Sequence, residues 1–307
     1  MKILYLGTAA IGIPLLRRCV SIGEVEGVIT APDKPQGRGL KLKPSPIKVE
    51  AENLGIEVFQ PQDVNSESTV EWCKKKGADF LVLFAYGQIL SAEILSISRW
   101  AINVHPSLLP RYRGAAPLER AIMSGETETG VTIIQMSEKV DAGGILIQES
   151  LPIEVDETCG ELSEHVSRLV PFLVEKTITG LLEGTINPKP QSFEGVSNAP
   201  KIRNCERLIN WENPSWMVHN LIRALSPSPL AFTTFRGRRI EIVHSRLADR
   251  EGSGRPGALI HSRGSLLVQC GIGLVELTEV KPEGKRAMPA SAFTNGYRPR
   301  KEEILGN

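Results

Sequence analysis

Asn103 and His105 are the residues whose types and spacing first suggest chemistry. They stand two positions apart at the end of an apolar run, so on a strand their side chains point to the same face. A side-chain amide beside an imidazole can stabilise negative charge that develops on a carbonyl oxygen. An ordinary polar strand end has the same composition, and the pair alone does not separate these interpretations.

Asp141 is the acid that could complete such a site. It follows a β-rich stretch, Glu128–Met136, and precedes Ala142 and two glycines, which permit close approach of the backbone. An aspartate in this position could orient an imidazole or accept a proton. A solvated loop aspartate is the alternative interpretation.

The elements that must position these residues alternate along the first half of the chain. Apolar runs predict strands, and amphipathic stretches between them predict helices; the strands are expected over residues 2–7, 25–30, 58–59, 79–85 and 101–105, and the helices include 46–54 and 68–76. This alternation predicts a doubly wound, Rossmann-like α/β sheet, which binds ligands at the carboxyl edge of its strands. The first turn, Gly7–Gly12, lacks the glycine patterns of dinucleotide and P-loop sites.

The amino-acid composition changes near residue 187, where prolines, glycines and polar residues follow one another. We therefore expect a first domain over residues 1–186, a linker over 187–205 and a second domain over 206–307. After a helix at 215–224, short strands are expected at 231–235, 239–245, 257–261, 266–270 and 273–280. Short strands separated by glycine-rich turns favour a small, OB-like β-barrel.

Charge is unevenly spread over these parts. Residues 1–205 carry 21 Lys+Arg and 25 Asp+Glu, a net charge of −4, whereas residues 206–307 carry 15 and 10, a net charge of +5. A basic C-terminal third suggests a polyanionic partner, although chance produces the same imbalance.

Several classes are not favoured by the sequence. No apolar stretch reaches the ~18 residues of a membrane span. The N-terminus enters a strand pattern at once, so we expect no targeting peptide and a cytoplasmic protein. The five cysteines lie at least 46 residues apart and the histidines form no ligand motif, which predicts reduced thiols and no metal.

Longer motifs carry a resemblance to a known family. They include Pro32-Asp-Lys-Pro-Gln-Gly-Arg-Gly39, Ala85-Tyr-Gly-Gln-Ile89, Asn103-Val-His-Pro-Ser-Leu-Leu-Pro-Arg-Tyr-Arg-Gly-Ala-Ala-Pro117, Val140-Asp-Ala-Gly143 and Leu221-Ile-Arg-Ala-Leu225. On these motifs the chain resembles the methionyl-tRNA formyltransferases of bacterial type across nearly its whole length. Such enzymes move a formyl group from 10-formyltetrahydrofolate to the amino group of methionine on initiator tRNA.

The resemblance implies roles for individual residues. Asn103 and His105 become the donors to the oxyanion, and Asp141 the residue that orients His105 and helps to move the amine proton. The folate pocket is implied for two short segments, which are Tyr86, Gly87, Gln88 and Ile89, and Ser107, Leu108, Leu109 and Pro110. Neither a membrane nor DNA is expected as a partner.

A basic segment indicates which acceptor is used. Lys34 to Lys48 holds five cations and no acid, and by resemblance it contacts the tRNA acceptor stem through Arg38, Lys34, Lys41 and Lys43. We expect this segment to be neither helix nor strand, with cations that nothing nearby neutralises. A sugar-nucleotide N-formyltransferase with the same folate donor is the alternative enzyme, and it leaves this segment without a role. A non-catalytic RNA-binding protein would explain the basic segment, but not the set of Asn103, His105 and Asp141.

Overall fold

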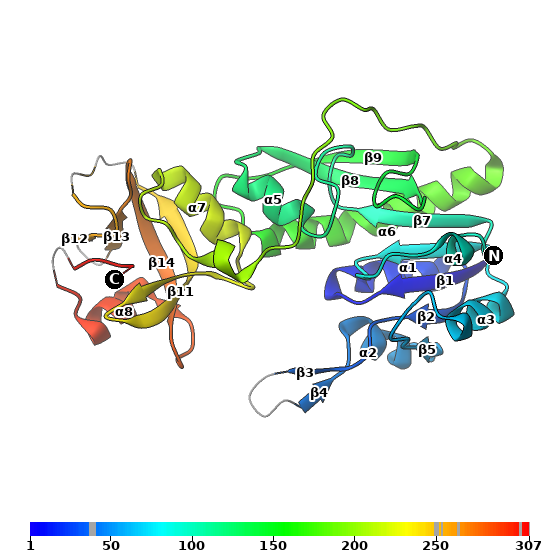
Figure 1. The fold of residues 1–307 in the computed structure, drawn as a ribbon, viewed down its shortest axis with the longest axis horizontal. Helices are drawn as coiled ribbons and strands as arrows, with labels where there is room; N and C mark the ends of the chain where they lie inside the picture. The colour runs from blue at the N-terminus through cyan, green and yellow to red at the C-terminus, as the bar shows by residue number, and fades with distance from the viewer. Residues whose placement is uncertain (37–40, 249–251, 253, 263–264, 301–302, 307) are drawn as a thin grey trace. The chain divides into compact units, whose positions relative to one another are not determined.

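The computed structural model describes residues 1–36, 41–248, 252, 254–262, 265–300 and 303–306. The chain divides into two compact units (Figure 1). The first comprises residues 1–117, 129–151 and 163–200, and the second comprises 118–128, 152–162 and 201–307. The second unit therefore includes two short segments, 118–128 and 152–162, that lie along the chain between parts of the first unit.

The first unit is organised around one mixed sheet. Within the described residues its strands follow the order β5 (Val58–Phe59), β2 (Glu24–Ile29), β1 (Lys2–Gly7), β6 (Phe80–Phe84), β7 (Trp100–His105), β8 (Glu128–Gln135) and β9 (Ile145–Pro152). Strands β5 to β7 pair in parallel, and β8 pairs antiparallel with β7. The carboxyl ends of β1, β6 and β7 therefore lie at one edge of the sheet.

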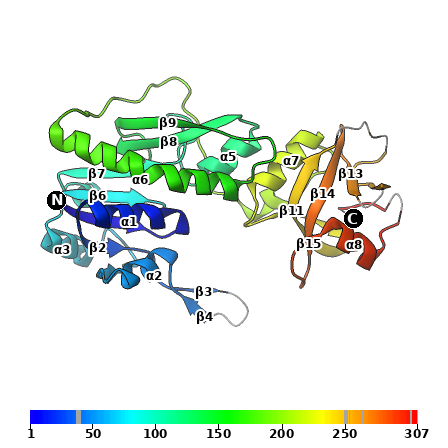
Figure 2. The same cartoon turned by 180° about the vertical axis from the view of Figure 1, so that it is seen from behind.

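Helices cover both faces of this sheet. Alternate residues of β1 and β6, such as Leu4 and Leu81, pack with α3 (Glu67–Lys76) and α4 (Ala92–Leu95) in one apolar cluster. On the other face, the Tyr5 hydroxyl donates to the Gly12 carbonyl, which precedes α1 (Ile13–Ile22), at 2.9 Å. The long helix α6 (Cys159–Glu183) lies beside α1 (Figure 2). The predicted doubly wound α/β architecture is confirmed.

The second unit is an antiparallel, curled sheet with the form of a half-barrel. In the described part of the chain its order is β10 (Ala231–Phe235), β11 (Arg238–Leu247), β14 (Leu274–Pro282), β13 (Ser265–Gln269) and β12 (Leu259–Ser262), with β15 (Met288–Pro289) paired to β14. Its core includes side chains of α7 (Ser215–Ala224) and α8 (Ala290–Tyr297), among them Ile222 and Phe293. The short elements α5 (Pro117–Met123) and η2 (Asn204–Arg207) belong to this unit, apart from Pro117, and η1 (Ala10–Gly12) belongs to the first.

The basic segment corrects two expectations. It was expected to be neither helix nor strand, yet β3 (Lys34–Gln36) and β4 (Lys41–Lys43) form a short antiparallel pair. The helix α2 (Pro46–Asn53), which follows at once, agrees with the helix expected over 46–54. Ser45 caps α2 by accepting a hydrogen bond from the Lys48 amide, and Pro46 occupies the first helical turn, where proline is favoured. Lys48 is also neutralised locally, because its Nζ lies 2.8 Å from Asp33 Oδ2. The expected lack of local neutralisation was therefore wrong for Lys48.

Candidate active site

Asn103 and His105 lie at the carboxyl end of β7 and are 8% and 4% exposed. Both line a cavity of about 590 Å³ within the first unit, which is in the size range of small-molecule sites. Its walls are mainly apolar, and three of its polar side chains, Asn103, His105 and Asp141, meet one another. The lining residues are Ile11, Leu83, Phe84, Ala85, Tyr86, Gly87, Gln88, Ile89, Asn103, Val104, His105, Pro106, Gly114, Ala115, Pro117, Val140 and Asp141.

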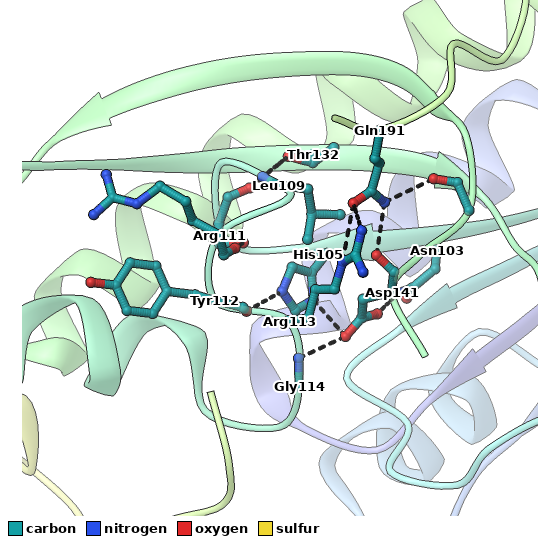
Figure 3. A network of polar contacts seen from close by, with 12 residues as sticks. Asn103, His105, Leu109, Arg111, Tyr112, Arg113, Gly114, Thr132, Asp141 and Gln191 are labelled. Carbon is teal, nitrogen blue, oxygen red and sulfur yellow. Dashed lines mark hydrogen bonds and ion pairs between the residues drawn. The ribbon is translucent and has the colours of Figure 1, made fainter. Parts of the chain in front are cut away.

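Asp141 joins Asn103 and His105, as Figure 3 shows. Asn103 Nδ2 donates to Asp141 Oδ1 at 3.1 Å, and the Gly114 amide donates to Oδ2 at 2.9 Å. The same Oδ2 lies 3.5 Å from His105 Nδ1. The structure thus brings together the three residues that were expected to carry the chemistry.

The protonation of His105 follows from its partners. Nε2 lies 2.8 Å from the Tyr112 carbonyl, which can only accept, so Nε2 carries a hydrogen. Burial lowers the pKa of His105, with a smaller contribution from Arg113; the Asp141 carboxylate and the Tyr112 carbonyl act in the opposite direction. A neutral ring therefore has its lone pair on Nδ1, facing Asp141.

The segment Ser107–Pro110 follows the site residues in the chain and is fixed by hydrogen bonds and packing. The Ser107 hydroxyl donates to the Arg111 carbonyl at 2.7 Å, and the Leu109 amide donates to Thr132 Oγ1 at 3.2 Å. Leu108 packs so closely on Gly130 that a Cβ there would lie 2.5 Å from Leu108 Cδ2. Among the described residues, the cavity lining includes none of Ser107, Leu108, Leu109 and Pro110.

Tyr86, Gly87, Gln88 and Ile89, in contrast, all line the cavity. Gly87 has a φ of +97°, which favours glycine, and Gln88 Oε1 accepts a hydrogen bond from the Val64 amide at 3.0 Å. The turn at Gly87 and the hydrogen bond between Gln88 and Val64 therefore fix the conformation of this segment.

A smaller cavity of about 100 Å³ shares Gln88, Ile89, Asn103 and Asp141 with the larger one. Leu83, Leu90 and the loop 136–140 also line it, and sequence reasoning did not assign these residues. Leu83 was open to detection, because it lies near the carboxyl end of the apolar run that forms β6. The loop had no comparable signal.

The expected tRNA-binding residues lie on the β3–β4 pair. Lys34 and Lys43 are exposed and are direct cross-strand partners, and Lys41 belongs to the same strand as Lys43. Like charges placed opposite each other are unfavourable unless an anion compensates them. Arg38 lies outside the described residues.

Comparison with known proteins defines the class. The description "Formyl transferase" matches residues 1–175, and "Formyl transferase, C-terminal domain" matches residues 201–298. The chain belongs to the formyl transferase family, whose members use 10-formyltetrahydrofolate as the donor. It is accordingly an enzyme of formyl-group transfer.

Particular relatives narrow the comparison. The methionyl-tRNA formyltransferase of Moorella thermoacetica is 40% identical over 309 residues, which cover 100% of this chain and 99% of that protein. The solved methionyl-tRNA formyltransferase of Clostridium thermocellum has a TM-score of 0.59 at 17% identity, covering 81% of this chain and 94% of that one. WlaRD, a sugar 3N-formyl transferase solved in the presence of dTDP and 5-N-formyl-THF, has a TM-score of 0.68 at 19% identity over 93% and 99% of the two chains. At these identities the two solved structures show a shared fold.

In the described ranges, no three or more His, Cys, Asp or Glu side chains are grouped so that they could hold a metal ion. No helix in the same ranges is both long and apolar enough to cross a membrane.

Proposed function

We propose that this protein transfers the formyl group of 10-formyltetrahydrofolate to the α-amino group of methionyl initiator tRNA. The observation that carries the proposal is the cluster of Asn103, His105 and Asp141 at a cavity, in a chain that matches a methionyl-tRNA formyltransferase over its whole length. Because aminoacyl-tRNA is used in the cytoplasm, we also propose that the protein acts there.

The larger cavity is the proposed folate site. A pterin is flat and amide-like, and a cavity with apolar walls and a few polar groups suits it. Tyr86, Gly87, Gln88 and Ile89 would contact the folate, whereas Ser107–Pro110 would act by holding the loop that carries Tyr112 and Gly114. When bound, the donor supplies the formyl carbon that the amine attacks and the nitrogen that leaves.

Asn103 is the proposed donor to the formyl oxygen. Its Nδ2 carries two hydrogens, and one is donated to Asp141. The other is available to stabilise the negative charge that develops on that oxygen. A neutral His105 has no further hydrogen to donate, because its one N–H, on Nε2, faces the Tyr112 carbonyl, so we assign the oxyanion role to Asn103.

His105 is the proposed proton acceptor, and Asp141 is the proposed partner that stabilises its charged form. An α-amine titrates near ~7.7, so a useful fraction is neutral at pH 7, and it must lose a proton once it has attacked. The lone pair on His105 Nδ1 can take that proton and then give it to the folate nitrogen as that nitrogen leaves. The imidazolium so formed would be stabilised by Asp141, 3.5 Å away.

The basic residues and the second domain are the proposed tRNA-binding parts. Lys34, Lys41, Lys43 and Arg38 would contact phosphates of the acceptor end, which would relieve the repulsion between Lys34 and Lys43. We retain the division into a catalytic domain (1–186), a linker (187–205) and a tRNA-binding domain (206–307) as part of this proposal. The net charge of +5 over residues 206–307 supports it.

One assay tests the proposed function. The protein is mixed with 10-formyltetrahydrofolate and offered either charged initiator tRNA or a 4-amino sugar nucleotide, and the formylated product is identified by mass. We expect formyl-methionyl-tRNA. Formylation of the sugar nucleotide alone would favour the alternative enzyme, and RNA binding without formylation would favour a binding protein.

Arg38 gives a sharper test of the tRNA contact. Its planar guanidinium can make a bidentate contact with a phosphate or a base edge, which lysine cannot copy. Arg38→Lys should therefore weaken tRNA binding almost as much as Arg38→Ala, with folate affinity unchanged. Full rescue by lysine would reduce Arg38 to a generic positive charge.

A further inference from the structure

Gln191 lies on the segment 187–200, which we call the strap. The strap stays with the first unit and is fixed to it by backbone hydrogen bonds. The Ile145 and Lys189 backbones exchange two of these bonds, at 2.7 and 2.9 Å, and the Arg113 amide donates to the Ser197 carbonyl at 2.9 Å. The strap therefore holds Gln191 at a defined position rather than on a free connection.

The Gln191 side chain forms hydrogen bonds with two backbone carbonyls of the loop that carries Asp141. Its Nε2 donates to the carbonyls of Asp141 and Gly143, both at 2.8 Å (Figure 3). Its Oε1 accepts from Arg113 Nε at 3.2 Å and from Nη2 at 2.6 Å. Two acceptors at one end and a cation at the other allow only this orientation of the amide.

The loop needs such support because its backbone is unusual. Asp141 has a φ of +49°, in the left-handed region that non-glycine residues seldom adopt. At Gly143 a Cβ would lie 1.8 Å from the Gln135 carbonyl oxygen, so the backbone there packs directly on β8. Gln191 closes the loop between these two points.

We propose that Gln191 is a positioning residue that holds the Asp141 carboxylate against Asn103 and His105, and that Arg113 acts through Gln191. This inference deepens the proposed function and rests on it. The carboxylate must reach Asn103, Gly114 and His105 at once, and its place is set by the backbone that Gln191 holds. A displacement of about 1 Å at such a site can cost ~10²-fold in rate.

The test uses the full chain and three variants. Gln191→Ala removes the amide, and Gln191→Glu keeps its shape but places an oxygen against two carbonyl oxygens. Ser192→Ala, on the same strap, is the matched control, because within the described residues the Ser192 hydroxyl accepts a hydrogen bond from the nearby Glu194 amide and takes no part in the contacts of Gln191. We expect both Gln191 variants to lower kcat by about 10–100-fold with KM values within twofold, and the control to match wild type.

A second readout needs no substrate. The charged groups that face His105 are Asp141 and Arg113. If Asp141 moves away in Gln191→Ala, the imidazole loses the carboxylate that favours its protonated form, so its NMR titration should move to lower pH. Arg113→Ala should cause a similar loss of kcat, and the double variant should lose little more, because both residues act through one contact.

The outcomes separate the two proposals. Wild-type protein that fails to formylate the tRNA overturns the proposed function, whereas the His105 titration still tests the strap. An active wild type with Gln191 variants of normal kcat, or an unchanged His105 titration, overturns the role of Gln191. A loss of kcat that is matched in the Ser192→Ala control does the same.

Discussion

Asp141→Asn should abolish most catalysis while leaving the fold intact. The carboxylate accepts from Asn103 Nδ2 at 3.1 Å and from the Gly114 amide at 2.9 Å. An asparagine has one acceptor oxygen, so its own NH₂ must face one of these two donors. The negative charge that stabilises protonated His105 is lost as well.

The size of the effect follows from one distance. Unit charges 3.5 Å apart, as between His105 Nδ1 and Asp141 Oδ2, interact by about 1 kcal/mol in water and roughly 5 kcal/mol at an effective dielectric constant of 20. Both side chains are at least nine-tenths buried, which favours a value between these limits and nearer the second. Because each 1.36 kcal/mol is tenfold in rate, we expect kcat to fall by about 10²–10³.

Single-turnover formylation of charged initiator tRNA, at saturating 10-formyltetrahydrofolate, measures this directly. Thermal unfolding by circular dichroism checks the fold, and Glu149→Gln provides an exposed acid-to-amide control in the same unit. A folded Asp141→Asn variant with a rate within threefold of wild type would refute the charge argument and remove Asp141 from proton transfer.

Three further outcomes are expected. Burial lowers the pKa values of both His105 and His219 below the ~6.5 of an unfolded chain. The unfolded state therefore binds more protons, and the stability of the protein should decline as the pH falls below about 6.5. Tm measured from pH 7.5 to 5.5 checks this, and a Tm that does not change with pH would contradict it. Gly143→Ala should destabilise the protein by more than about 2 kcal/mol, because the new Cβ would meet the Gln135 carbonyl. Gly296→Ala should be tolerated, because a Cβ there has no neighbouring atom within 4 Å. The free energies of unfolding in urea compare the two variants. Replacing Lys34 and Lys43 together by alanine should make the affinity for tRNA less dependent on salt, by an amount that corresponds to up to about two lost phosphate contacts. The KM for folate should not change. An unchanged slope of log affinity against log salt concentration would place the pair outside the tRNA site.

The local elements and one half of the site are encoded in short stretches of the chain. The apolar runs of β1 and β6 are encoded within five or six residues, because a strand buried on both faces must be apolar throughout. The period of two along a strand likewise fixed that Asn103 and His105 share a face. These inferences needed no knowledge of distant residues.

The rest of the site depends on contacts between residues that are far apart in the chain. Asp141 is 36 positions from His105, and Gln191 is a further 50 along the chain, so their meeting depends on sheet order and on the path of the strap. The Tyr112 carbonyl that sets the His105 tautomer is a backbone group, which no residue type reveals. The same limit explains why Ser107–Pro110, adjacent to the site in sequence, support it without lining the cavity. The ion pair between Lys48 and Asp33 is equally non-local, because the β3–β4 pair folds the segment back and brings together residues 15 positions apart.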